Sequence, residues 1–88
     1  MTTLYQELVI WRKHDKHTAI RFVCLMNVTT RKYSVQSADF YRLPLSQEDL
    51  ANFQRQFIEL FCETDPGERA GAFDSVEEAI ASHVEQFG

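Results

Sequence analysis

Hydrophobic and polar residues alternate along three stretches in the first half of the chain. Over residues 3–12 the pattern repeats at every second position, which is the period of a β-strand. Residues 18–28 repeat it, but their second half is apolar on both faces, as is typical of a central strand. The third stretch, residues 33–42, changes phase near Ser37, which indicates a β-bulge. Polar runs between the stretches predict hairpin turns.

The second half of the chain changes to the helical period. Ser46 begins a segment whose apolar positions form a single stripe, and Pro66 with Gly67 ends it. Ser75 and Glu78 make a full capping box, which predicts the start of a second, shorter helix.

Strands first and helices afterwards favour an α+β fold. The arrangement expected is a three-stranded antiparallel sheet followed by two amphipathic helices packed on one face, in the order βββαα. With 88 residues, 44% of them hydrophobic, the chain has the size and composition of a single domain over residues 1–88.

If both helices cover one face of the sheet, the other face is left open. That face would present seven apolar or aromatic residues as a candidate interface: Tyr5, Val9, Trp11, Val23, Leu25, Tyr33 and Val35. Exposed apolar patches of this kind mark binding sites, and Trp and Tyr are enriched at their energetic centres. Two alternatives stay open: a helix wraps around to cover this face, or the face assignment is inverted.

The net charge of −4 is unevenly distributed. Residues 1–45 carry seven basic and three acidic side chains, whereas residues 46–88 carry two basic and ten acidic ones. The predicted sheet is therefore mildly basic and the predicted helices strongly acidic, although the whole chain is acidic. A candidate basic patch is formed by Arg12, Lys13, Lys16, Arg31 and Lys32.

Residues able to carry chemistry are few and scattered. His14 and His17 flank Asp15, but no third or fourth ligand follows at a recognisable spacing, so no metal site is predicted. His83 falls inside the apolar stripe of the second helix, where a role in catalysis or pH sensing competes with simple packing. No glycine-rich phosphate loop or nucleophile motif is present. No cofactor is expected, and the chain is predicted not to be an enzyme.

Cys24 and Cys62 are the two cysteines, and no CxxC spacing occurs, so both are expected to be free thiols, buried or half-buried, in a reducing compartment. The longest uncharged apolar run, residues 22–26, is too short to span a bilayer, and residues 1–4 lack the features of a secretory signal. The expectation is a cytoplasmic protein with no membrane partner.

These patterns favour a small non-catalytic protein-interaction or self-associating accessory module. Its partner would be another protein or a second copy of the chain, giving a homodimer. The alternative is a nucleic-acid-binding module, in which Trp11 and the tyrosines of the sheet stack bases beside the basic patch. The acidic balance of the chain argues against this alternative.

Overall fold

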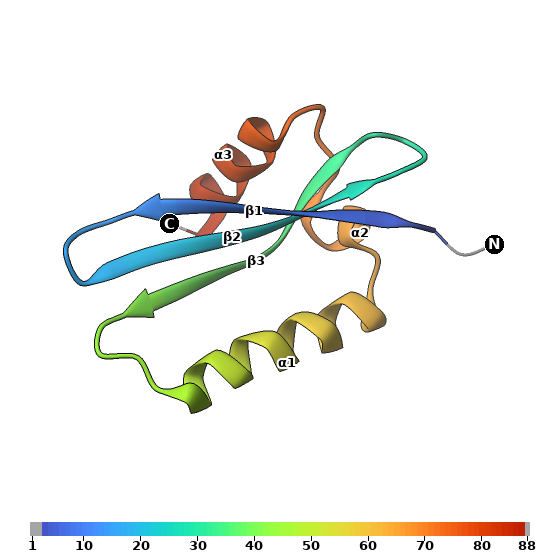
Figure 1. The fold of residues 1–88 in the computed structure, drawn as a ribbon. Coiled ribbons are helices and arrows are strands. Elements are labelled where there is room, and N and C mark those ends of the chain that lie inside the picture. Colours follow the sequence, from blue (N-terminus) through green and yellow to red (C-terminus); the bar gives the residue numbers. More distant parts are fainter. Residues whose placement is uncertain (1–2, 88) are drawn as a thin grey trace.

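The structure, a computed structural model, describes residues 3–87. The elements are β1 (Tyr5–Lys13), β2 (Thr18–Asn27), β3 (Tyr33–Arg42), α1 (Gln47–Glu63), α2 (Pro66–Ala70) and α3 (Val76–Phe87). The strands form one antiparallel sheet in the order β1-β2-β3 (Figure 1). The predicted α+β fold, with a three-stranded antiparallel sheet followed by helices, is confirmed.

Strand β2 is the centre of the sheet, as its two-sided apolar pattern predicted. Its residues from Phe22 to Met26 are all buried, because each face of the strand is covered. The β-bulge predicted near Ser37 is also present. Cys24 pairs with Val35 and Val23 with Ser37, so Gln36 is an extra residue in β3.

The two long helices lie on opposite faces of the sheet, not on one face as predicted (Figure 1). Ala79 and its neighbours on α3 pack against the face that carries Phe22 and Cys24. On the other face, Phe53 of α1 lies edge-on against Tyr41, with 5.2 Å between the ring centroids. The physical reason is that β2 is apolar on both faces, so both faces need a cover.

The connection between the long helices runs along the outer edge of β3. Ser34 donates a hydrogen bond from Oγ to the carbonyl of Gly71 (2.7 Å), and Tyr33 and Phe73 exchange two backbone hydrogen bonds of 2.8 and 2.9 Å. This segment holds the short helix α2, where the sequence indicated only a helix break. Pro66 occupies the first turn of α2, a position that suits proline because its missing N–H is not needed there.

Candidate functional site

The seven residues of the predicted interface do not form one exposed surface. Val23 and Leu25 are buried, because α1 covers the face expected to be open. Tyr33 and Val35 belong to the opposite face, where both pack with the core beneath α3. Residues opposed across an antiparallel ladder share a face, and Val35 is opposite Cys24. The prediction had therefore placed these two residues on the wrong face.

The part of the predicted interface that stays accessible is centred on Trp11. Its side chain is 58% exposed, and its ring lies 5.4 Å from that of Tyr41. The guanidinium of Arg21 lies 5.1 Å from the ring centroid of Tyr41 and 6.0 Å from that of Trp11. The indole therefore packs against the Tyr41 ring and the Arg21 guanidinium, while much of its surface faces solvent.

An ion pair fixes the cation beneath Trp11. The Nη2 atom of Arg21 donates to Oδ2 of Asp39 at 2.8 Å, and Asp39 is buried. Burial raises the pKa of Tyr41; Arg21 partly lowers it and Asp39 raises it. The phenol is thus uncharged at neutral pH.

Beside this cluster the surface is hollowed over a volume of about 530 Å³. The hollow lies between the β1–β2 hairpin, the end of β3 and the start of α1. We call it the Trp11 hollow and define it by six of its lining residues: Trp11, Lys13, Lys16, Leu43, Leu45 and Leu50. Its three leucines are exposed, so apolar side chains from two connected segments gather around the indole without being buried.

These three leucines were not among the residues that the sequence pattern predicted for the site. Leu43 and Leu45 flank Pro44 in the link between β3 and α1, and Leu50 lies at the first turn of α1. The available signal was two large apolar residues in a turn, where polar residues are usual.

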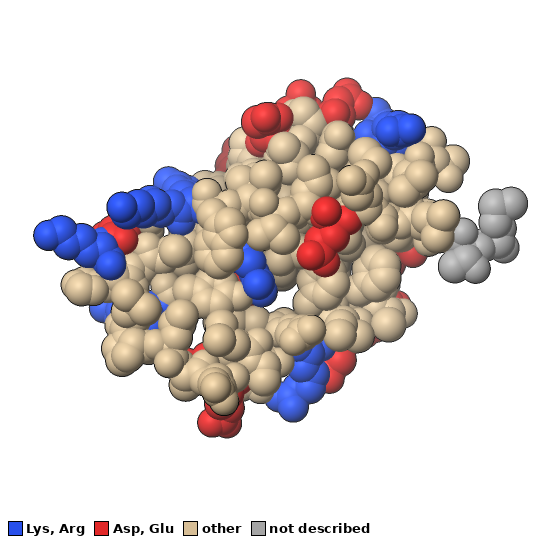
Figure 2. Space-filling model, in the orientation of Figure 1, with Lys and Arg blue, Asp and Glu red and all other residues tan. Residues whose placement is uncertain are grey.

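The predicted basic patch is divided between the two ends of the sheet (Figure 2). Lys13 and Lys16 lie at the β1–β2 hairpin and line the Trp11 hollow, whereas Arg31 and Lys32 lie in the β2–β3 turn. Arg12 is next to Trp11 in β1, so its side chain belongs to the other face of the sheet, that of Ile20 and Phe22. The two groups are separated by the length of β2, roughly 30 Å at 3.3 Å per residue. Lys32 also forms an ion pair with Asp74. The five cations therefore do not make one surface.

The three histidines are not brought together. In the β1–β2 turn, the backbone N–H of His17 donates to Oδ1 of Asp15 at 2.8 Å, and this hydrogen bond lowers the pKa of Asp15. Asp15 therefore stabilises the turn. Over residues 3–87, no group of three or more His, Cys, Asp or Glu side chains is placed to hold a metal ion.

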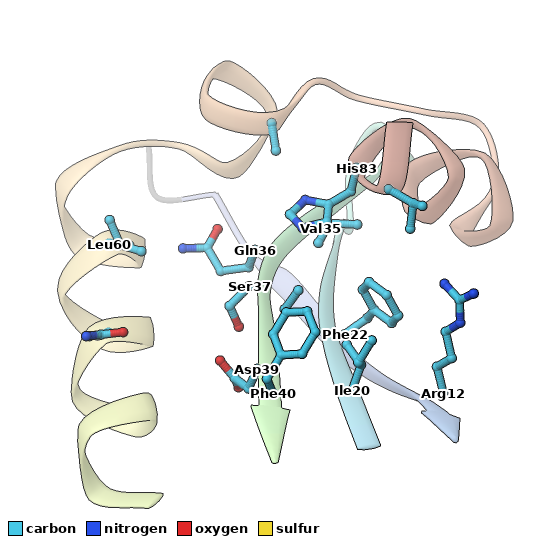
Figure 3. Close-up of a pocket in the computed structure, with 14 residues that line it drawn as sticks. Arg12, Ile20, Phe22, Val35, Gln36, Ser37, Asp39, Phe40, Leu60 and His83 are labelled. Carbon is cyan, nitrogen blue, oxygen red and sulfur yellow. The ribbon is translucent and has the colours of Figure 1, made fainter. Parts of the chain in front are cut away.

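A second hollow, of about 380 Å³, lies alongside β3 between α1 and α3 (Figure 3). Its lining includes Gln36, Asp39, Leu60 and His83. His83 is half-buried, and its ring meets Phe22 edge-to-face at 6.2 Å between centroids. Packing against the core thus accounts for the position of His83 in the apolar stripe of α3.

Comparison of the chain with protein-family models, with curated proteins and with solved structures found no match. Within the described part of the chain, no helix combines the length and the apolar character needed to cross a lipid bilayer.

Proposed function

We propose that this chain is a small non-catalytic protein-interaction module and that the Trp11 hollow is its binding surface. The observation that carries the proposal is the exposed indole of Trp11, held on Tyr41 and Arg21 at the rim of a hollow of about 530 Å³. An exposed aromatic ring fixed by its neighbours loses little conformational freedom on binding, which favours affinity.

The composition of the hollow indicates the kind of segment that would bind. Leu43, Leu45 and Leu50 offer an apolar surface, so an apolar side chain of the partner would be desolvated there. Lys13 and Lys16 lie in the lining and are exposed, which favours carboxylates next to that side chain. The lining also contains Asp15, whose carboxylate accepts a hydrogen bond from the backbone of His17, so positive charge still predominates. The partner expected is therefore an acidic peptide segment with an aromatic or aliphatic anchor.

Nucleic-acid binding by the sheet has less support. It would require the basic residues to follow one path beside the exposed aromatic rings, and the cations lie at two ends of the sheet. Of the five cations in the predicted basic patch, Lys13 and Lys16 line the hollow beside Trp11. The binding experiment below therefore includes an oligonucleotide, which tests nucleic-acid binding directly.

The test uses the fluorescence of Trp11, which is the only tryptophan in the chain. The probes are an acidic peptide with a central phenylalanine, the same peptide with alanine in that place, and a single-stranded oligonucleotide. The expected result is a saturable spectral change with the phenylalanine peptide alone. Leu45→Glu should abolish the change. Val28→Glu, at an exposed position in the β2–β3 turn, is the matched control and should preserve it.

Two outcomes oppose the proposal. If no peptide gives a saturable change, or if Leu45→Glu binds as well as the parent chain, the hollow is not a peptide site. If the oligonucleotide alone binds, with an affinity that falls steeply as salt rises, the nucleic-acid alternative takes its place.

A further inference from the structure

Strand β1 is an open edge of the sheet. Its residues are exposed or half-buried throughout, whereas β2 is buried at its centre. The three helices pack chiefly on β3, at the other edge of the sheet. Within residues 3–87, β2 is the only strand that pairs with this nine-residue strand, so its outer edge presents unpaired backbone groups and is a template for another strand.

The hydrogen bonds at the two ends of β1 establish which backbone groups point outward. The N–H of Val28 donates to the carbonyl of Leu4 at 3.0 Å, and the N–H of His14 donates to the carbonyl of Thr18 at 3.1 Å. Antiparallel pairs alternate between bonded and non-bonded, so the even-numbered residues of β1 exchange hydrogen bonds with β2. The odd-numbered residues, Tyr5, Glu7, Val9, Trp11 and Lys13, therefore direct their N–H and C=O groups away from the sheet.

We propose that β1 pairs antiparallel with β1 of a second copy of this chain, with Ile10 on the two-fold axis, so that the two sheets become continuous. In this register Val9 lies opposite Trp11 of the partner subunit. Glu7 lies opposite Lys13 of the partner subunit. The proposal goes beyond the peptide site, because Leu43, Leu45 and Leu50 take no part in the pairing, although Trp11 and Lys13 belong to both surfaces.

Charge complementarity of the strand with itself selects this register. A two-fold axis requires the pairing to centre on one residue of β1. The outward-facing N–H and C=O groups of the two strands must also lie opposite one another. Centring on Ile10 places Glu7 opposite Lys13 and Val9 opposite Trp11, which are favourable cross-strand pairs. Centring on Val9 instead places Glu7 opposite Trp11, so the opposite charges no longer meet.

The two-fold axis stands perpendicular to the sheet, so it relates each face to the same face of the partner. Both Trp11 hollows would then open on one side of the dimer. A partner with two acidic segments could engage both hollows at once, which raises its apparent affinity without any new contact.

The test is the solution mass, measured by light scattering over a range of protein concentrations. The parent chain is expected to dimerise. Glu7→Lys and Lys13→Glu each place like charges opposite one another at two symmetric positions, and each should weaken the dimer about tenfold or more at low salt. An equimolar mixture of the two variants should dimerise again, because every Lys then faces a Glu. Val28→Lys, at an exposed position in the β2–β3 turn and outside the paired residues 7–13, is the control and should leave the dimer unchanged.

Val9→Pro provides a second, independent test. It removes an N–H that points away from the sheet, so the fold should persist while the dimer is lost. The proposal is overturned if the parent chain is a monomer at the highest attainable concentration, or if Val9→Pro dimerises normally. It is also overturned if the two charge variants fail to rescue each other in the mixture.

The peptide site and the dimer can fail separately. Leu45→Glu should still dimerise while losing the acidic peptide, and Val9→Pro should still bind the peptide as a monomer. Loss of both peptide binding and dimerisation in either variant, with the fold retained, would mean that the peptide and the second copy bind to one and the same surface.

Discussion

Asp39 is a buried carboxylate in a sheet of predominantly apolar composition, and its ion pair with Arg21 is central to the Trp11 cluster. The two residues lie directly opposite each other on neighbouring strands, and the carboxylate side chain is only 9% exposed. Removing one member of a buried pair leaves the other charge without compensation, and this costs more than the pair itself contributes. The side chain of Arg21 is 28% exposed, so part of its guanidinium can reach water, which limits the cost.

Asp39→Ala is therefore expected to lower the free energy of unfolding by about 2 kcal/mol. Urea unfolding followed by the fluorescence of Trp11 measures this. Asp74→Ala, which removes the exposed ion pair with Lys32, is the matched control and should cost no more than about 0.5 kcal/mol. Equal losses in the two variants would show that the Arg21–Asp39 pair has no special role.

The two thiols differ in environment, so they should differ in reactivity. Cys24 is completely buried, as predicted, and burial raises its pKa to about 11. Cys62 is exposed, not buried or half-buried as predicted, because it lies on α1, where no residue is buried. Only the thiolate reacts with alkylating reagents. At pH 8 the folded chain should take up one equivalent of iodoacetamide, at Cys62, and a second equivalent only when unfolded. Rapid labelling of Cys24 in folded protein would contradict the buried position of β2.

The raised pKa of Cys24 also predicts how the free energy of unfolding changes at alkaline pH. Because the folded state holds this proton more tightly than the unfolded state, stability is unaffected below the ordinary thiol pKa of 9.0. It then falls as the pH rises from 9 toward 11. Cys24→Ala should show a smaller fall over that window in urea unfolding.

At the scale of elements, the sequence pattern predicted where strands and helices lie but not how the helices are placed. Period and capping residues located all three strands and the starts of the two long helices at Ser46 and Ser75. An amphipathic stripe indicates that a helix buries one side, but it does not indicate which face of the sheet that side packs against. Since β2 is apolar on both faces, the pattern was compatible with both helices on one face of the sheet and with one helix on each face.

The candidate site was predictable only in part for the same reason. Trp11 was identified because the alternating pattern of residues 3–12 placed this aromatic side chain on the sheet face expected to be open. Leu43, Leu45 and Leu50 join it through the path of the chain from β3 onto the second face, and this path depends on tertiary packing. Local patterns carry no information about that path.

The cap of α3 is expected to matter more than an exposed serine usually does. Oγ of Ser75 accepts a hydrogen bond from the N–H of Glu78 at 3.1 Å, and α3 carries Ala79 into the core. Ser75→Ala should lower the free energy of unfolding by about 1 kcal/mol. Ser75→Asp, which retains an acceptor, should stay within a few tenths of the parent. A loss of the same size in both variants would assign the effect to something other than the cap.

For the molecule as a whole, the two sides of the sheet are unequally packed. Beneath α3 lies the main cluster of buried residues, which includes Phe22, Cys24 and Val35. On the other side no residue of α1 is buried, and Ile58 and Phe61 remain exposed. The α1 layer therefore has less apolar burial holding it to the sheet, and helix propensity alone contributes little to its stability.

Native-state hydrogen exchange should reveal this inequality directly. The amides of α1 are expected to open at a lower free energy than those of β2 and α3, because a weakly buried element can detach without global unfolding. Phe57→Ala should speed exchange in α1 alone, whereas Val84→Ala, which weakens packing beneath α3, should speed exchange in the most protected amides of the sheet. Leu50 of α1 lines the Trp11 hollow, so a bound acidic peptide should slow exchange at the start of α1. Equal protection of α1 and α3 in the free chain would mean that the sheet and both helices unfold as one unit. The part of the hollow that α1 forms would then open only when the whole chain unfolds.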